Sequence, residues 1–115
     1  MNDESAIGCM AALSHSMRMR IFRFLMNKGP SGANAGEICD ALEIAATTAS
    51  FHFKELHRSG LVRATREGRF IRYAVHIETV SKLFSHLLSD CCEGQPERCG
   101  SFIDRLAKQL ERFDQ

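Results

Sequence analysis

The amino-acid sequence predicts a mainly α-helical protein that carries one small β-hairpin. Apolar residues recur at helical spacing through most of the chain. In one basic stretch, apolar and polar side chains alternate as they do in the strands of a hairpin. Gly and Pro residues fall between these segments, where turns are expected. The length of 115 residues fits one domain, so we take residues 1–115 as a single unit. Its core would be small, and a protomer of this size often gains stability by dimerising.

The composition is that of an ordinary globular protein. Hydrophobic residues make up 44% and charged residues 25% of the chain, and no apolar run approaches the length of a membrane span. The acidic start MNDESAIG is unlike a signal peptide, so we expect a cytoplasmic protein. Thiols are reduced in the cytoplasm. A cluster of cysteines therefore indicates metal or redox chemistry more than a structural disulfide. The total of five cysteines is odd, which also argues against a closed disulfide framework.

Two helices are expected in the first part of the chain. Asn2 or Asp3 can cap the first helix, which runs to about Leu13, and Ser14 or Ser16 can cap the second. The apolar positions of the second helix follow the helical spacing i, i+4, i+7, i+8 and are Met17, Ile21, Phe24 and Leu25.

A third and a fourth helix follow a loop at residues 27–34, which is rich in Gly and Pro. Asn34 caps the short third helix, AGEICDAL. Its buried residues are expected to be Ile38, Ala41 and Leu42. After a tight connection at Glu43 and Ile44, the fourth helix covers about residues 46–59, and Gly60 ends it.

The hairpin and two further helices complete the chain. Two short stretches alternate between apolar and polar side chains, as strands do: LVRATR before Glu67-Gly68 and RFIRYAV after it. This pattern predicts a hairpin with a two-residue turn at Glu67-Gly68. A fifth helix covers about residues 77–90, with the apolar stripe Val80, Leu83, Phe84, Leu87 and Leu88. Ser101 can cap an extra C-terminal helix at residues 101–113, with the apolar stripe Phe102, Ile103, Leu106, Leu110 and Phe113.

This order of elements is typical of a winged helix-turn-helix, in which a recognition helix precedes a basic hairpin. The whole chain has a net charge of only +1, but residues 51–73 carry six basic and two acidic side chains, a net charge of +4. A run of charges is often only a solvated face. Here it coincides with the helix and the hairpin that would contact double-stranded DNA, so we expect a DNA-binding protein.

The candidate DNA-contacting residues lie on the outer face of the fourth helix and on the hairpin. With Ala49, Phe53 and Leu56 toward the core, the opposite face presents hydroxyls, a cation and an aromatic ring to base edges and phosphates. Arg66 and Arg69 flank the turn, where they would meet the DNA backbone or the minor groove. The full set is Thr47, Thr48, Ser50, Phe51, His52, Lys54, Arg58, Arg66 and Arg69.

Two members of this set have a second interpretation. Phe51 can touch a thymine methyl group, or it can fold back onto the core. His52 lies at the border of the core face, where it can contact a phosphate or pack half-buried.

The sequence resembles the ArsR/SmtB family of metalloregulatory repressors from about Ala12 to Val75 and through the fifth helix. The stretches that carry the likeness are ALSHSMRMRIFRFL, EICDALEI, TTASFHFKELHRSGLV and REGRFIRYAV. The resemblance implies a winged helix-turn-helix homodimer built from the first and fifth helices. It also implies a repressor that binds operator DNA and is released when an inducer binds.

The chain departs from the family pattern at two places. Ser16 stands where the family often has Pro, and Ala45-Ala46 stand where its recognition helix often opens with Ser-Gln. Alanine caps a helix poorly and reads no base. The contacts should therefore shift to Thr47, Thr48 and Ser50.

Two inducer sites of the family are incomplete in this chain. The family carries a Cys-x-Cys pair in the third helix, and only Cys39 of that pair remains here. Because one thiol cannot chelate an ion, Cys39 is expected to be a core cysteine. Of the zinc ligands on the fifth helix His86 matches one, while Tyr73, Val75 and Ser89 occupy the other positions. Neither site is therefore expected to work in its usual form.

Cys91, Cys92 and Cys99 resemble the three cysteines of arsenic-responsive members of the family. Soft thiolates favour thiophilic ions, and trivalent arsenic or antimony takes three sulfurs. The segment at about residues 91–100 is thus expected to bind arsenite or antimonite as inducer, with no organic cofactor. A methylated arsenical needs only two sulfurs, which Cys91 and Cys92 could supply. Cys91 also continues the apolar stripe of the fifth helix, so it can instead pack at the dimer interface.

Other functions remain open at this point. A thiol redox or persulfide sensor would use Cys39 with Cys91 or Cys92, and a zinc or other divalent sensor would use the cysteines with His76 or His86. An enzyme is not expected, because the histidines show no nucleophile or paired-carboxylate pattern and no Gly-rich phosphate loop exists. Cys9, alone in the first helix, is expected to be structural.

Overall fold

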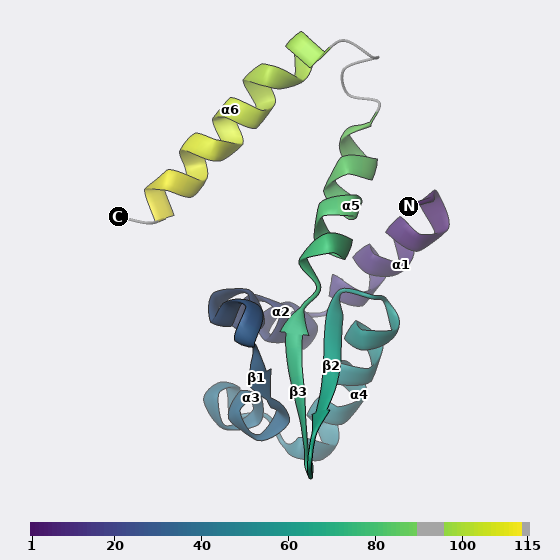
Figure 1. Cartoon of the computed structure of the whole chain (residues 1–115), viewed down its shortest axis with the longest axis vertical. Helices are drawn as coiled ribbons and strands as arrows, with labels where there is room; N and C mark the ends of the chain where they lie inside the picture. Colours follow the sequence, from purple (N-terminus) through teal and green to yellow (C-terminus); the bar gives the residue numbers. More distant parts are fainter. Residues whose placement is uncertain (90–95, 114–115) are drawn as a thin grey trace.

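The computed structural model describes residues 1–89 and 96–113, and it places helices around a small antiparallel sheet (Figure 1). The elements in chain order are α1 Asp3–Leu13, α2 Ser16–Lys28, the short 3₁₀ helix η1 Gly29–Ser31, β1 Ala33–Asn34, α3 Ala35–Leu42, α4 Ala46–Arg58, β2 Val62–Glu67, β3 Phe70–Val75, α5 Ile77–Leu88 and α6 Pro96–Phe113. The predicted fold class, mainly α with a small hairpin, is confirmed.

The N-termini of α1 and α2 are fixed by side-chain caps. The Asn2 side chain accepts a hydrogen bond from the Ser5 backbone N–H at 2.8 Å, as one of the two predicted caps. At α2 the prediction of a serine cap is wrong, because His15 Nδ1 accepts from the Met17 backbone N–H at 3.1 Å. An imidazole nitrogen can accept a hydrogen bond as a serine hydroxyl does.

The helix α3 begins and ends as the sequence predicts. Asn34 and Glu37 form a capping box, in which each side chain accepts from the other residue's backbone N–H, at 2.8 and 3.3 Å. The expected burial of Ala41 is wrong, because α3 turns Ala41 toward solvent and buries Ile38. At Glu43 the backbone adopts a left-handed conformation with φ 55°, which makes the tight connection to α4.

The sheet has the strand order β1-β3-β2, with all pairs antiparallel. The hairpin turn lies at Gly68-Arg69, one residue later than predicted, because Glu67 pairs with Phe70. Gly68 has φ 61° and takes the first turn position, where a two-residue hairpin of this kind requires glycine. The strand β1 was not predicted, and it joins the sheet where Ala33 pairs with Tyr73.

The core lies between the helices and the inner face of the sheet. Its largest fully buried side chains are Ile21, Leu25, Ile38, Leu56, Leu61 and Cys9. The Cys9 thiol donates a hydrogen bond to the Ser59 carbonyl oxygen at 3.4 Å, which ties α1 to the end of α4. The prediction that Cys9 is structural is confirmed.

The last two helices are amphipathic. The helix α5 buries Leu83 and leaves Phe84 and Leu87 exposed, and its last helical residue is Leu88. The helix α6 begins at Pro96 and not at Ser101, because proline suits the first position of a helix, where its missing N–H is not needed. No helix within the described residues is long and apolar enough to cross a membrane.

Candidate nucleic-acid interface

The inner face of α4 holds the helix against the rest of the molecule. Ala49, Phe53 and Leu56 are buried, as their spacing predicts. The Phe53 ring lies against the Tyr73 ring of β3, with centroids 4.7 Å apart. This packing fixes which side of α4 faces outward.

The outer face of α4 presents six of the predicted DNA-contacting side chains to solvent. They are Thr47, Thr48, Ser50, Phe51, Lys54 and Arg58. Phe51 is 59% exposed, so it does not fold back onto the core. An exposed aromatic ring among hydroxyls and a cation is suited to a groove of DNA, where it can contact a thymine methyl group.

The N-terminus of α4 lies on the same side and has no side-chain cap. Ala45 occupies the cap position and has no side-chain acceptor, so no side-chain cap binds the first-turn N–H groups of α4. Free N–H groups and the helix dipole together attract a phosphate. The alanines that depart from the family pattern thus leave donors available for a DNA backbone.

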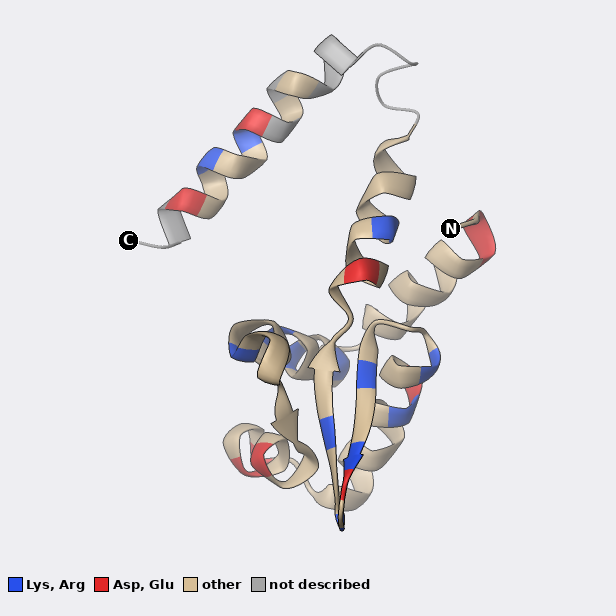
Figure 2. Ribbon diagram, in the orientation of Figure 1, with Lys and Arg blue, Asp and Glu red and all other residues tan. Residues whose placement is uncertain are grey.

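The hairpin carries the remaining basic residues. Arg66 lies on β2 near the turn and Arg69 is the second residue of the turn; both are exposed, and Figure 2 shows Lys and Arg along both hairpin strands and α4. Arg72 is held within the protein, because it pairs with Glu67 (Nε to Oε1, 2.9 Å) and donates to the Ser31 carbonyl oxygen at 3.2 Å. Arg63, Arg66 and Arg69 have no ion pair within the described residues, and Arg66 and Arg69 lie nearest the tip of the hairpin, where a wing contacts DNA.

Arg58 lies apart from the other predicted contacts. It is the last residue of α4, roughly 18 Å along the helix axis from Ala46 at a rise of 1.5 Å per residue. It lines a cavity with residues of α1, and its Nη1 is 3.9 Å from Glu55 Oε1. The structure does not bring Arg58 together with the hairpin tip.

His52 is buried and takes no part in the exposed face, so the prediction of a phosphate contact is wrong in this conformation. It is only 6% exposed, and its ring centroid lies 4.6 Å from that of His15. Its Nδ1 has no hydrogen-bond partner within residues 1–89 and 96–113. Burial, and then the neighbouring His15 and Arg18, lower the pKa of His52, so the ring is neutral near pH 7. The packing interpretation of His52 holds.

Cys39 is half-buried in α3 and packs against the core. It lines a cavity of about 500 Å³ between α3, α4 and β3, together with Ser50 and Arg69. Burial, and then the charge of Asp40, raise the pKa of the Cys39 thiol. A thiol that stays protonated is a poor nucleophile and a poor metal ligand, which weakens the redox interpretation.

The histidines near α5 have partners of their own. His86 Nε2 lies 2.6 Å from Asp3 Oδ1, which joins the end of α5 to the start of α1. His76 Nδ1 lies 3.1 Å from Thr79 Oγ1. Within the described part of the chain, no three His, Cys, Asp or Glu side chains are grouped as a metal site would require.

The predicted three-cysteine site lies outside the described residues. Cys91 and Cys92 fall in the segment 90–95, and Cys99 falls in the first turns of α6, where only the backbone is described. The site therefore stays a prediction.

The His86 contact with Asp3 and the His15 contact with His52 were not predicted, since no sequence spacing relates residues so far apart.

Comparisons with known proteins agree with this geometry. A family model described as a helix-turn-helix domain matches residues 13–64. An uncharacterized HTH-type transcriptional regulator, YceK of Bacillus subtilis strain 168, is 34% identical over 68 residues, which are 59% of this chain and 67% of YceK.

Two solved structures share the fold. One is an ArsR-like transcriptional regulator from Rhodococcus sp. RHA1, with a TM-score of 0.64 at 24% identity, covering 96% of this chain and 92% of that one. The other is the homodimeric winged helix-turn-helix domain of Mb0332 from Mycobacterium bovis, a possible ArsR-family regulator, with a TM-score of 0.61 at 26% identity and coverage of 77% and 85%. The chain belongs to the HTH-type transcriptional regulators, and it shares its fold with regulators of the ArsR type.

Membership in this family assigns a role to the elements described above. In a winged helix-turn-helix regulator, α4 is the recognition helix and the β2–β3 hairpin is the wing. The prediction that the chain is a regulator and not an enzyme is confirmed by these relatives.

Proposed function

We propose that this helix-turn-helix regulator is a cytoplasmic, homodimeric member of the ArsR family that represses an arsenic-resistance operon. It binds double-stranded operator DNA and leaves it when trivalent arsenic, or antimony, binds the thiolates of Cys91, Cys92 and Cys99. The observation that carries the DNA-binding part is the exposed outer face of α4 beside the basic wing. The three closely spaced cysteines carry the inducer part.

In the proposed complex α4 enters the major groove. Thr47, Thr48 and Ser50 meet base edges, while Phe51 contacts a thymine methyl group and Lys54 a phosphate. Arg66 and Arg69 of the wing meet the backbone or the adjacent minor groove. Two such heads in a dimer would read half-sites about one DNA turn apart.

The proposed dimer forms through α1 and α5. These helices pack on each other within one protomer, and both leave apolar side chains exposed. The exposed side chains are Ile7 and Met10 of α1, and Phe84 and Leu87 of α5. Apolar side chains exposed on two packed helices are typical of an interface, and the homodimeric state of Mb0332 supports a dimer here.

The inducer would act through the end of α5. Adjacent cysteines on a regular helix point about 100° apart, so both can bind one ion only if the helix end unwinds. An ion held by Cys91, Cys92 and Cys99 would therefore favour a different conformation beside the dimer interface. Release of DNA follows if that conformation binds the operator more weakly.

Operator binding with added arsenite tests this proposal. Fluorescence anisotropy of labelled operator DNA is measured while arsenite is titrated into the wild-type protein and into the Cys91→Ser, Cys92→Ser and Cys99→Ser variants. Each variant should keep its operator affinity and lose release by arsenite. Cys39→Ser is the matched control and should respond as the wild type does, because the Cys39 thiol is protonated and packs on the core.

The same titration separates the alternatives. Release of the Cys92→Ser or Cys99→Ser variant at the wild-type arsenite concentration would contradict the three-thiol site. Release by oxidant or persulfide, abolished in Cys39→Ser, would favour the redox sensor, and release by zinc would favour the divalent sensor. A methylated arsenical should still release Cys99→Ser, since it needs only two sulfurs.

A further inference from the structure

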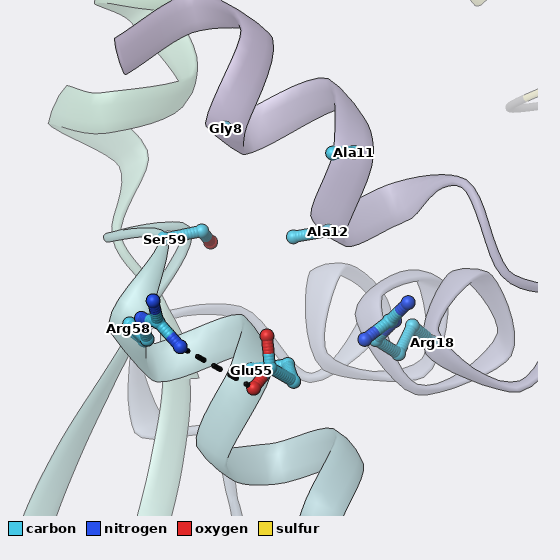
Figure 3. A pocket seen from close by; sticks show the side chains of 7 residues that line it. All are labelled: Gly8, Ala11, Ala12, Arg18, Glu55, Arg58 and Ser59. Carbon is cyan, nitrogen blue, oxygen red and sulfur yellow. Dashed lines mark ion pairs between the residues drawn. The ribbon is translucent and has the colours of Figure 1, made fainter. Parts of the chain in front are cut away.

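A second candidate site lies between α1, α2 and α4, where no cysteine lines the surface. It is a cavity of about 380 Å³, a size within the range of small-molecule sites (Figure 3). Its wall on α1 consists of small residues, Gly8, Ala11 and Ala12. Arg18 of α2 and Glu55 and Arg58 of α4 supply the charged groups.

The guanidinium of Arg18 is incompletely satisfied. Its Nε is buried, and no atom of the described residues accepts its hydrogen. A buried N–H donor without an acceptor is unfavourable, because it has lost water without gaining a partner. Arg18 is therefore suited to an acceptor that enters the cavity.

Glu55 does not meet this need in the structure. Its Oε1 is 3.9 Å from Arg58 Nη1, and the Arg58 side chain is 79% exposed, so this ion pair is long and solvated. Two guanidinium groups and one carboxylate line the cavity, which leaves a net positive charge. The charge favours an anionic ligand.

The wall on α1 favours a ligand with an apolar part. A Cβ placed at Gly8 would have no atom within 4 Å, so the space beside this residue is open. Ala11 and Ala12 present only methyl groups. An inorganic anion would satisfy Arg18 and would leave this apolar wall uncovered, whereas an organic anion can cover both.

We propose that the cavity binds a small organic carboxylate. The Arg18 side chain turns so that its buried Nε faces the cavity, and the carboxylate accepts two hydrogen bonds from the guanidinium, one of them from Nε, in the fork geometry that arginine offers. Arg58 lies at the open side and adds positive charge. The hydrocarbon part of the ligand lies against Gly8, Ala11 and Ala12. Because α1 and α4 both line the cavity, the bound ligand joins the N-terminal helix to the recognition helix.

The test uses NMR of the full-length, ¹⁵N-labelled protein without DNA or arsenite, so its outcome is independent of the proposed arsenic response. Benzoate is the probe, benzamide is its uncharged analogue, and inorganic phosphate is the anion without an apolar part. Benzoate should shift the Arg18 Nε–Hε signal in a saturable manner and slow its exchange with water. Benzamide should not shift it, and phosphate should bind about tenfold more weakly than benzoate because it leaves the apolar wall bare.

Three variants complete the test. Arg18→Lys should bind benzoate about tenfold more weakly, because lysine lacks the planar fork. Glu55→Gln should bind it several-fold more tightly, because the competing carboxylate is gone. Arg23→Gln, an exposed position on α2 outside this cavity, is the matched control and should bind as the wild type does.

Three results would overturn the proposal. In the first, benzoate leaves the Arg18 signal unchanged, as it would if a partner subunit or the Glu55 carboxylate filled the cavity. In the second, Glu55→Gln fails to tighten binding. In the third, phosphate binds as tightly as benzoate, which would mean that the cavity recognises charge alone.

Discussion

His52 of the recognition helix packs against His15, the residue that caps α2, with their ring centroids 4.6 Å apart and their planes tilted by 48°. The contact connects the start of α2 to the buried side of α4. Because His15 accepts from the Met17 N–H through Nδ1, the cap and the ring contact involve the same imidazole. The position of α4 thus rests in part on the contact between these two imidazole rings.

This pair predicts that acid weakens the fold. Burial, and then His15 and Arg18, lower the pKa of His52 below its ordinary value of 6.5. Above about pH 6.5 the ring is neutral in both folded and unfolded chains, and its contribution to stability is complete. As the pH falls below that value, the unfolded chain takes up the proton more readily, so the free energy of unfolding should decrease. Urea denaturation between pH 8 and pH 5.5 measures this loss.

A pair of variants isolates the contribution of His52. His52→Gln cannot titrate and should show a smaller loss of stability between pH 7 and pH 5.5 than the wild type does. His57→Gln, which removes an exposed histidine of the same helix, is the matched control. Equal pH dependence in all three proteins would exclude His52 as the titrating group.

The sequence predicts those parts of the fold that depend on neighbouring residues. The bounds of α3, the inward stripe of α4 and the glycine of the hairpin turn all follow from local spacing and from backbone preference. The strand β1 is only two residues long and exists through its pairing with Tyr73 and Arg72, which are distant in sequence. No local pattern could have predicted it.

The candidate site shows the same division. The period of α4 predicts that Thr47, Ser50 and Lys54 face outward, and they do. The burial of His52 arises from contact with His15, which no period of α4 contains. Arg58 lies on the predicted face, but it stands at the end of the helix beside α1. The length of the helix therefore separates it from the tip of the hairpin.

Gly32 should tolerate no side chain. Its backbone has φ 62° and ψ −150°, a region that is essentially restricted to glycine, and an added Cβ would lie 1.9 Å from the Tyr73 carbonyl oxygen. Gly32→Ala should therefore lower the free energy of unfolding by about 3 kcal/mol or more. Thermal or urea unfolding measures the effect.

Gly8→Ala is the matched control for that substitution. Gly8 lies within α1, and a Cβ there meets no atom within 4 Å. Alanine favours a helix interior over glycine by about 0.8–1.0 kcal/mol, so this variant should be slightly more stable than the wild type. If Gly32→Ala also proved neutral, the close approach of the η1–β1 loop to β3 would be wrong.

The wing arginines should control the salt dependence of operator binding. Arg69 is exposed within the turn, and no ion pair to it occurs in the described part of the chain. Arg69→Gln should weaken binding to all DNA sequences alike and reduce the slope of log K against log salt by about 0.9 for each lost phosphate contact. Arg72→Gln should change this slope less, because Arg72 already pairs with Glu67. An unchanged slope for Arg69→Gln would remove Arg69 from the interface.

The exposed apolar face of α5 should control assembly. Phe84 is 53% exposed and Leu87 is 48% exposed, on a helix that packs against α1. Phe84→Glu places a charge in the proposed interface, where it would be buried without a partner, and should convert the dimer to a monomer at micromolar concentration. Light scattering coupled to size-exclusion chromatography measures the mass. The monomer should bind the operator more weakly, since it can read only one half-site.

Met19→Glu places the same charge on the exposed face of α2 and should leave the dimer intact. A Phe84→Glu protein that remained dimeric would show that the subunits associate through another surface.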